Sequence, residues 1–368
     1  MGKTTEQALA ELTEGFYRKS EYPALAQQMR EWAESRPLAG LRVLDGTPVF
    51  RNTTLKYRAL LAAGADLAVS APEIMPCDPA VCDALDAAEL RVFRNAPPVT
   101  EEFDVVLDCG AAHARVPSRF GYVELTRTGV HHYRELGGAR RVFAADSGRI
   151  KAIETCLGTG ESFLRALRQL GLGEVAGRRA VVFGCGKVGR GIVFYLLRAG
   201  AEVFAADFPE VLEHLPDGVA GIDVTDRKEL EAVLARAQIV VTATGIRHAL
   251  TGRFDMTKLA ASDALIANMG VEDEYGDEMP EERVLNRKRP LNFILAEPTR
   301  LVYIETTMAL HNAGALELLR GGSGMTEPPA ALEERLLETS CRDGEVGGEI
   351  RELPAMLASE RERGEEKR

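Results

Sequence analysis

The sequence lacks the features that mark membrane, secreted and nucleic-acid-binding proteins. No apolar run approaches the ~20 residues that span a bilayer, and the first residues, MGKTTEQALAEL, contain no apolar signal core. Acidic residues outnumber basic ones by 56 to 45, and the formal charge of −11 disfavours nucleic acid and anionic membranes as partners. We therefore expect a cytoplasmic protein whose partner is a small molecule, with no nucleic acid and no membrane.

Cysteine is scarce and scattered. Of the six cysteines, Cys77 and Cys82 are close in sequence, but no second Cys or His pair accompanies them at the spacing of a zinc site. The sequence therefore predicts reduced thiols and no metal site.

Short apolar strands alternate with helices along most of the chain, which at 368 residues is long enough for two domains. The strands are expected at 41–44, 67–69, 90–93, 103–107, 180–183, 201–206, 239–242, 264–267 and 293–295. Such alternation is typical of an α/β fold with parallel sheets. A helix at 306–320 is expected to return to the first domain.

The strongest motif follows the apolar strand 180–183. It reads G-x-G-x-x-G, with glycines at Gly184, Gly186 and Gly189. The first glycine permits a tight turn, the second lets the backbone approach a pyrophosphate, and the third lets helix and strand pack closely. The helix that follows points its N-terminal amides at the phosphates. The next strand ends at Asp207, whose carboxylate accepts hydrogen bonds from ribose hydroxyls and repels a 2′-phosphate, so NAD is favoured over NADP.

A series of short motifs, in the same order, resembles S-adenosylhomocysteine hydrolases. Near the N-terminus, YPALAQQMREW, RPLAGLRV and LLAAGADL resemble the opening helix of that family, its first strand and the turn that follows. Further on, TRTGVH, GTGES, TATG, NMG and AEPTRLV resemble T-T-T-G-V-H, G-C-R-E-S, T-T-T-G, N-I-G and A-E-G-R-L-V. The matches span most of the chain and are concentrated in the cofactor domain.

The resemblance implies a Rossmann-type NAD-binding domain inserted in a discontinuous α/β substrate domain, with a cleft between them. The expected division is 1–160 for the substrate domain, 161–308 for the NAD-binding domain, 309–345 for the return and 346–368 for a charged C-terminal tail. Family members are commonly tetramers. Because the family's C-terminal extension has no counterpart here, we expect a homodimer or a homotetramer.

The resemblance also implies which residues contact NAD. Asp207 is expected at the adenosine ribose, and the segment that begins with Thr126 at the nicotinamide half. The full expected set is Thr126, Arg127, Thr128, Gly184, Gly186, Lys187, Val188, Gly189, Asp207, Thr242, Thr244, Gly245, Asn268, Gly270 and Tyr303.

The substrate side departs from the family. The family's second catalytic aspartate becomes Cys109, its catalytic lysine becomes Ile150, and two of its histidines become Val271 and Leu310. The loop after the first strand also differs from the family's T-V-E-T. The substrate-binding residues expected there are Phe50, Arg51, Asn52 and Thr53.

A different set of proton-transfer groups is therefore required, because each positioned group is worth about 10²–10⁴-fold in rate. The candidate catalytic residues are Glu154, Lys151, Asp108, Cys109 and His311. Each also has a structural interpretation. Glu154 and Lys151 could be a solvated pair on a helix, Asp108 could cap a turn beside the small buried thiol of Cys109, and His311 could be an ordered histidine without a catalytic role.

Three functions stay open. The favoured one is an NAD-dependent enzyme that oxidises a secondary hydroxyl of a nucleoside or sugar-like substrate. It would form a transient ketone, allow β-elimination such as dehydration, and return the hydride. The alternatives are a plain NAD-dependent dehydrogenase with net redox turnover and a non-catalytic NAD-binding protein.

Overall fold

The computed structural model describes residues 5–72, 77–94, 99–137, 140–213 and 215–357. The chain divides into two compact units. Unit 1 consists of Met1–Lys151 and Leu301–Gly348, and unit 2 of Ala152–Arg300 and Glu349–Arg368. Unit 1 is therefore discontinuous in sequence, because unit 2 is inserted into it. Within the described ranges, no helix is both long enough and apolar enough to cross a membrane.

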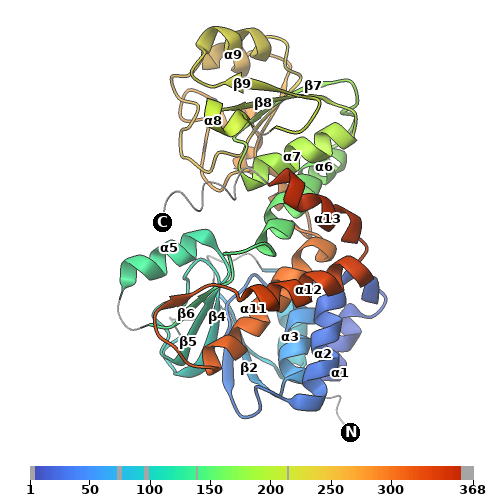
Figure 1. Cartoon of the computed structure of the whole chain (residues 1–368), viewed down its shortest axis with the longest axis vertical. Coiled ribbons are helices and arrows are strands. Elements are labelled where there is room, and N and C mark those ends of the chain that lie inside the picture. Colours follow the sequence, from blue (N-terminus) through green and yellow to red (C-terminus); the bar gives the residue numbers. More distant parts are fainter. Residues whose placement is uncertain (1–4, 73–76, 95–98, 138–139, 214, 358–368) are drawn as a thin grey trace. The chain divides into compact units, whose positions relative to one another are not determined.

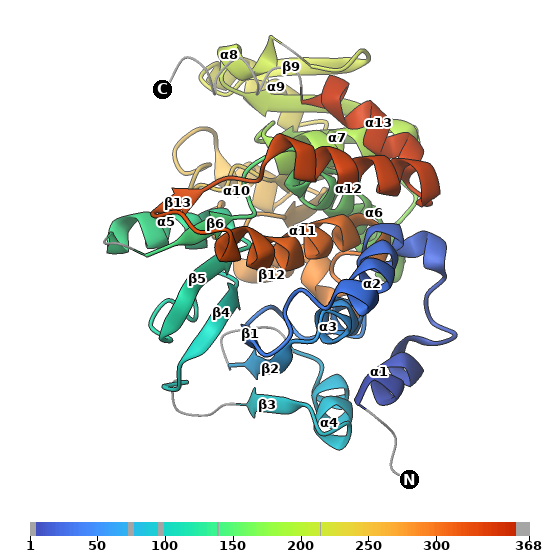
Figure 2. The same cartoon turned by 60° about the horizontal axis from the view of Figure 1, so that its bottom comes forward.

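Unit 1 is built on a seven-stranded sheet with the order β13-β6-β5-β4-β1-β2-β3, and its neighbouring strands pair in parallel (Figure 2). Its strands are β1 (Arg42–Asp45), β2 (Asp66–Ala71), β3 (Arg91–Arg94), β4 (Phe103–Asp108), β5 (Ser118–Glu124), β6 (Val142–Ala144) and β13 (Met325–Thr326). Its helices are α1 (Thr5–Thr13), η1 (Lys19–Glu21), α2 (Pro23–Ser35), α3 (Thr53–Ala62), α4 (Pro79–Ala87), α5 (Arg127–Leu136), α11 (Leu301–Leu319) and α12 (Ala330–Asp343).

The core of unit 1 lies between its central strands and the helices that pack on them. Val43, Val105 and Leu107 are fully buried, which fits strands covered on both faces. Helix α11 is buried along most of its length and contacts α2, α3, α12 and β5. The last part of the chain therefore completes the core that the first part begins.

Unit 2 is built on a six-stranded parallel sheet with the order β12-β11-β10-β7-β8-β9. Figure 1 labels three of its neighbouring strands, β7, β8 and β9. Its strands are β7 (Arg179–Phe183), β8 (Glu202–Asp207), β9 (Val219–Asp223), β10 (Ile239–Thr242), β11 (Leu265–Asn268) and β12 (Leu285–Pro290). Its helices are η2 (Ile153–Gly158), α6 (Thr159–Gln169), α7 (Lys187–Arg198), α8 (Pro209–Leu212), α9 (Arg227–Leu234), α10 (Met256–Ala260), η3 (Glu281–Arg283) and η4 (Leu291–Ile294). Counted from β7, this is the order 3-2-1-4-5-6 of dinucleotide-binding folds. The predicted α/β class is confirmed.

One predicted strand of unit 2 is wrong. Residues 293–295 do not form the last strand, because 291–294 form the 3₁₀ helix η4, in which Phe293 is 55% exposed. The sheet instead ends with β12, whose sequence LNRKRP is polar. An edge strand with solvated side chains has no apolar run, and this explains why the pattern missed it.

The boundaries also differ from the predicted ones. The units divide at 151/152 and 300/301 rather than at 160/161 and 308/309. The π-helical turn η2 packs tightly on α7, since a Cβ added at Gly191 would lie 1.8 Å from the carbonyl oxygen of Cys156. Helix α11 is one continuous element of unit 1 from Leu301 onward.

Part of the predicted charged tail is a helix. Gly347–Met356 forms α13, in which Ile350 and Leu353 are buried. Glu349 of this helix accepts hydrogen bonds from Tyr195 and Arg198 of α7. The rest of the predicted tail, 358–368, lies outside the described residues.

Candidate functional site

The glycine turn of unit 2 fits a bound pyrophosphate. Gly184 has φ +86°, a left-handed conformation that favours glycine, and a Cβ added at Gly189 would lie 1.7 Å from the carbonyl oxygen of Gly184. Protein contacts therefore require these two glycines. A Cβ added at Gly186 would meet nothing within 4 Å. Open space at the second glycine, at the start of α7, is what a pyrophosphate approaching the backbone needs.

Asp207 is held beside this turn at the end of β8. One carboxylate oxygen accepts a hydrogen bond from the Cys185 amide (2.7 Å) and the other from the Phe208 amide (2.8 Å). Burial, followed by the charge of Asp207, raises the pKa of the Cys185 thiol to about 12, so this thiol is neutral. A pocket of about 260 Å³ is lined by both Gly186 and Asp207, and by apolar side chains that suit a flat base. The glycine turn and Asp207 therefore line the same pocket.

Thr242 and Asn268 organise the ends of β10 and β11. Thr242 Oγ1 donates to Asn268 Oδ1 (2.9 Å), and Asn268 Nδ2 donates to the carbonyl oxygens of Gly270 and Lys288. Both side chains are fully buried. They shape the loops at this edge of the sheet, and their contact with NAD stays a prediction.

Glu274 is a residue of this edge that sequence reasoning missed. It is fully buried and accepts hydrogen bonds from the amides of Thr244 (2.8 Å) and Gly245 (2.7 Å). Burial raises the pKa of its carboxyl. A Cβ added at Gly270 would lie 1.9 Å from Glu274 Oε1, so glycine is required there by the protein itself. In the sequence, Glu274 was hidden within the acidic stretch VEDEYGDE.

The other residues expected at the cofactor lie at two helix starts and on α11. Lys187 and Val188 are in the first turn of α7. Thr126 caps α5 in unit 1: its Oγ1 accepts from the Gly129 amide (3.1 Å) and donates to Glu124 (2.8 Å). The remaining residues are Arg127 and Thr128, which are exposed at the start of α5, and Tyr303, which is buried on α11.

Three carboxylates end adjacent strands of the unit 1 sheet. Asp45, Asp108 and Glu124 close β1, β4 and β5, which are neighbours in the sheet, and all three are fully buried. Open α/β sheets bind ligands at the carboxyl ends of their strands. Asp45 forms an ion pair with Lys56 of α3, which is also buried. The backbone places the predicted Asp108 in this group of acids.

Asp108 is saturated by protein donors. It accepts hydrogen bonds from the Cys109 amide (2.8 Å), the Tyr133 hydroxyl (2.6 Å) and His113, through both its amide (3.1 Å) and its Nδ1 (3.0 Å). Burial raises the pKa of Tyr133, so its hydroxyl stays protonated and donates. Asp108 therefore orients its neighbours, His113 above all. No motif in the sequence singles out His113.

His311 is the predicted histidine with an unused nitrogen. It is fully buried on α11, its Nε2 donates to the Val123 carbonyl oxygen (2.9 Å), and its Nδ1 has no hydrogen-bond partner in the described part of the chain. Burial, and then the charge of Lys56, lower the pKa of His311 well below its usual value, with a smaller contribution from Lys151. The ring is therefore neutral, and Nδ1 is a proton acceptor.

The structure brings some of the other candidates close to His311. Burial lowers the pKa of Lys56. The thiol of Cys109, which is also buried, interacts electrostatically with the Lys56 amine. Lys151 is buried at the end of the first segment of unit 1. Glu154 is on the turn η2 of unit 2 and is half-buried. Cys109, Lys151 and His311 therefore belong to one buried polar region of unit 1.

The predicted substrate loop is ordered by its own contacts. The Arg51 guanidinium stacks on the ring of Phe16, 3.7 Å from its centre. Thr53 Oγ1 donates to the Pro48 carbonyl oxygen (2.9 Å), and Asn52 is buried beside it. Phe50 is half-buried. In the described ranges, no group of three or more His, Cys, Asp or Glu side chains could hold a metal ion.

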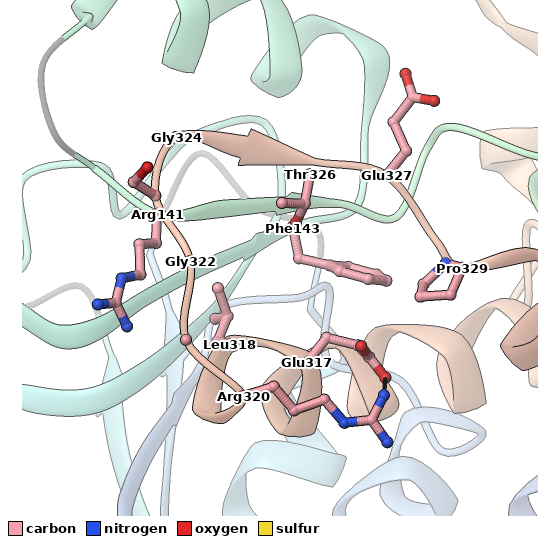
Figure 3. Close-up of a pocket in the computed structure, with 12 residues that line it drawn as sticks. Arg141, Phe143, Glu317, Leu318, Arg320, Gly322, Gly324, Thr326, Glu327 and Pro329 are labelled. Carbon is pink, nitrogen blue, oxygen red and sulfur yellow. Dashed lines mark hydrogen bonds and ion pairs between the residues drawn. The ribbon is translucent and has the colours of Figure 1, made fainter.

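A pocket of unit 1 lies beside β6 and the short edge strand β13 (Figure 3). It has a volume of about 300 Å³ and is lined by Arg141, which precedes β6, and by the loop Gly321–Gly324, which precedes β13. Its Arg320 is paired with Glu317 (2.7 Å). Because the buried acids Asp45, Asp108 and Glu124 lie at the carboxyl ends of β1, β4 and β5, we place the candidate site there rather than at this pocket.

The strand order, glycine turn and acid of unit 2 define a Rossmann-type dinucleotide-binding domain. Residues 155–286 match the family model described as "S-adenosyl-L-homocysteine hydrolase, NAD binding domain". At low identity, the chain is similar to members of the S-adenosylhomocysteine hydrolase superfamily. The predictions of this superfamily and of NAD as cofactor are confirmed.

Similar proteins carry two related names. The chain is 27% identical over 281 residues to an S-inosyl-L-homocysteine hydrolase of Methanosarcina mazei, which covers 68% of this chain and 66% of that protein. It is 27% identical over 274 residues to an adenosylhomocysteinase of Sulfurisphaera tokodaii, covering 67% and 64%. These matches span slightly less than two thirds of each relative's length. Among solved structures, a dipicolinate synthase chain from Bacillus halodurans matches 77% of this chain and 99% of its own, with 12% identity and a TM-score of 0.48.

Proposed function

We propose that this protein is an NAD-dependent enzyme that oxidises a secondary hydroxyl of a nucleoside or sugar-like substrate. The reaction would pass through a transient ketone, allow β-elimination such as loss of water, and restore the hydroxyl. The observation that carries the proposal is an NAD-binding domain whose second glycine faces open space and whose acid is fixed beside it. The names of the similar proteins, which act on nucleoside-like homocysteine adducts, support the substrate class.

The chain's own residues would supply binding and proton transfer. NAD, when bound, supplies reversible hydride transfer. His311 is the best general base, because burial keeps its ring neutral and Val123 fixes the proton on Nε2, which leaves Nδ1 to accept. Lys151, Glu154 and Cys109 are the further proton carriers that we propose. Asp108, with all its donors inside the protein, would act as a positioning residue for them.

The substrate loop and the remaining NAD contacts complete the proposal. Residues 50–53 would contact the substrate, and Thr126, Arg127, Thr128 and Tyr303 the nicotinamide half of NAD. We further propose a cytoplasmic homodimer or homotetramer.

The first experiment is to denature the purified protein, quantify the released nucleotide, and read its redox state by absorbance near ~340 nm. Near-stoichiometric NAD, partly reduced, supports a captive cofactor, and a screen of nucleosides for dehydration or cleavage would follow. An empty protein that binds NAD weakly and forms NADH with an alcohol indicates a plain dehydrogenase. A protein that neither contains nor binds NAD overturns the proposal.

The variant His311→Gln separates catalysis from NAD binding. Because Gln can still donate to the Val123 carbonyl oxygen, the fold is expected to persist. Loss of the Nδ1 acceptor should slow substrate oxidation by about 10²–10⁴-fold, the range for one general base, at unchanged NAD content. An unchanged rate would remove His311 from the mechanism.

A further inference from the structure

Unit 1 contains three side chains that form a linear hydrogen-bonded series. His113 Nδ1 lies 3.0 Å from Asp108 Oδ1, and His113 Nε2 lies 2.8 Å from Ser70 Oγ. Ser70 is the penultimate residue of β2, Asp108 ends β4, and His113 is in the turn after β4. Acid, histidine and serine in this order, each within hydrogen-bond distance of the next, form the arrangement that activates a serine in several unrelated folds.

The protonation pattern suits a nucleophile. A carboxylate can only accept, so in the neutral form of the His113 ring Nδ1 carries the proton, and Nε2 accepts from the Ser70 hydroxyl. Asp108 is itself held by Tyr133 and by the Cys109 amide. Gly46 faces the ring so closely that an added Cβ would lie 2.3 Å from His113 Nδ1. The imidazole is therefore fixed in the orientation that a general base needs.

The turn that carries His113 has an unusual backbone. Ala111 has φ +55°, a left-handed conformation that costs a residue with a Cβ roughly 1–2 kcal/mol. The amides of Gly110 and Ala111 both donate to the buried Glu124, at 3.0 and 2.9 Å, and hold the turn. Such backbone strain is found preferentially at functional sites.

Ser70 and His113 line a pocket of about 540 Å³. Only 3% of Ser70 and 5% of His113 is exposed, so the reacting groups lie at a largely dry wall. Arg115, His132 and Arg140 also line the pocket, and none of its described lining residues is acidic. These basic groups favour an anionic ligand in the pocket. They stand out because the chain as a whole has a net charge of −11.

We propose that Ser70, His113 and Asp108 form a second catalytic site, which hydrolyses a small carboxylic ester whose acyl part carries a negative charge. Ser70 Oγ attacks the acyl carbon, and its proton passes to His113 Nε2 and then to the departing alcohol. Water, deprotonated by the same nitrogen, releases the acid from the acyl-serine and regenerates Ser70. The balance is ester plus water to acid plus alcohol, with no cofactor.

The first test measures the nucleophile directly on the full-length protein. A phosphonofluoridate probe is expected to modify Ser70 alone, as read by peptide mass spectrometry. His113→Asn should slow this labelling by about 10²–10⁴-fold, the range for a general base. Ser70→Ala should abolish it, and Ser118→Ala, which removes a serine hydroxyl from β5, should leave it unchanged. Labelling elsewhere, or an equal rate in His113→Asn, would overturn the proposal.

The second test measures turnover and charge selectivity without added NAD. Hydrolysis of mono-4-nitrophenyl succinate is expected to show a lower KM than that of 4-nitrophenyl acetate, and Ser70→Ala should reduce both rates by about 10²-fold or more. Arg140→Gln should raise the KM for the succinate ester alone. If Ser70→Ala and His113→Asn change only the melting temperature, the three residues are a structural network and the proposal fails. Serine labelling and ester hydrolysis are both independent of NAD content. The esterase proposal and the proposed NAD-dependent function can therefore be overturned independently of each other.

Discussion

At the scale of single residues, Gly186 and Gly189 belong to one motif but are required by different neighbours. Gly189 faces the carbonyl oxygen of Gly184, whereas Gly186 faces open space and has φ −72°, which alanine adopts without strain. Protein packing therefore explains the third glycine. It leaves the second without a reason inside the protein, which fits the predicted approach of a pyrophosphate there.

This difference gives a paired prediction. Gly186→Ala should keep the melting temperature and weaken NAD binding at least about tenfold, or 1.4 kcal/mol, because the methyl group occupies the pyrophosphate's path. Gly189→Ala should lower the unfolding free energy by about 1–3 kcal/mol, the usual cost of overpacking. Calorimetric titration with NAD and thermal unfolding check both variants. A Gly186→Ala protein with unchanged NAD affinity would contradict this assignment.

The buried pair of Lys56 and Asp45 carries a second prediction. Asp45 also accepts hydrogen bonds from the Thr47 amide and hydroxyl, so its charge persists when the lysine is removed. Lys56→Met should therefore cost about 3–5 kcal/mol, the usual result of leaving one buried charge unpaired. The double variant Asp45→Asn with Lys56→Met should recover much of this loss. Urea unfolding of the three proteins measures it, and equal stability of the single and double variants would argue against the pair.

Site residues were predictable where they lie close together in the sequence at a characteristic spacing. The glycine turn and Asp207 lie within one strand–helix–strand segment, so sequence spacing identified them. Ser70, Asp108 and His113 meet only because β2 and β4 flank β1 in the sheet, and no spacing encodes this. No sequence pattern singles out Lys56, whose burial follows from the packing of α3 in unit 1.

At the scale of elements, Glu305 of α11 holds the start of α2. Its carboxylate accepts hydrogen bonds from the amides of Ala24 (3.1 Å) and Leu25 (3.2 Å), two of the unpaired donors of a helix N-terminus. The hydroxyls of Thr306 and Ser340 bind its other oxygen. Burial raises the pKa of Glu305 to about 7, above the 4.5 of a free glutamate.

The third prediction is a pH dependence of stability. Between pH 4.5 and 7 the folded state holds a proton at Glu305 that the unfolded state has lost, so this carboxyl's contribution falls as the pH rises through that window. Glu305→Gln, which keeps an acceptor for the α2 amides, should gain up to about 3 kcal/mol relative to the native protein between pH 4.5 and 8. Unfolding at several pH values measures the difference. Parallel curves would contradict it, and Glu305→Ala should be less stable throughout.

Elements were predictable where apolar runs mark them. The central strands of both sheets are continuous apolar segments, and their positions were recognised. The polar edge strand β12 was missed. Helix α13 was missed because its segment is glutamate-rich and short of apolar residues, although Ile350 and Leu353 are buried.

At the scale of the whole molecule, the two units have separate hydrophobic cores. One contains α2, α3, α11 and the inner strands of unit 1, and the other contains β7 to β11 of unit 2 with α9 and α10. A ligand that binds one folded unit stabilises that unit by mass action.

The fourth prediction concerns unfolding of the intact chain. Calorimetry should show two transitions. NAD at 100 times its Kd should stabilise the unit 2 transition most, by up to about 2.7 kcal/mol, because the proposed pyrophosphate and adenosine-ribose contacts lie in unit 2. Gly186→Ala should remove this shift and leave the other transition in place. A single transition that moves as a whole with NAD would mean that the units unfold together.

The insertion of unit 2 has a consequence for synthesis on the ribosome. Residues 152–300, which contain the six strands of the unit 2 sheet, are translated in full before α11 and β13 exist. The sheet of unit 2 can therefore form before α13 is added, while unit 1 still lacks its longest helix and an edge strand. During that interval the amides of Ala24 and Leu25 have no Glu305 to bind, and the apolar faces of α2 and β5 lie bare. The nascent chain would therefore fold first in its central segment, and the apolar faces of unit 1 are most exposed just before residues 301–368 emerge.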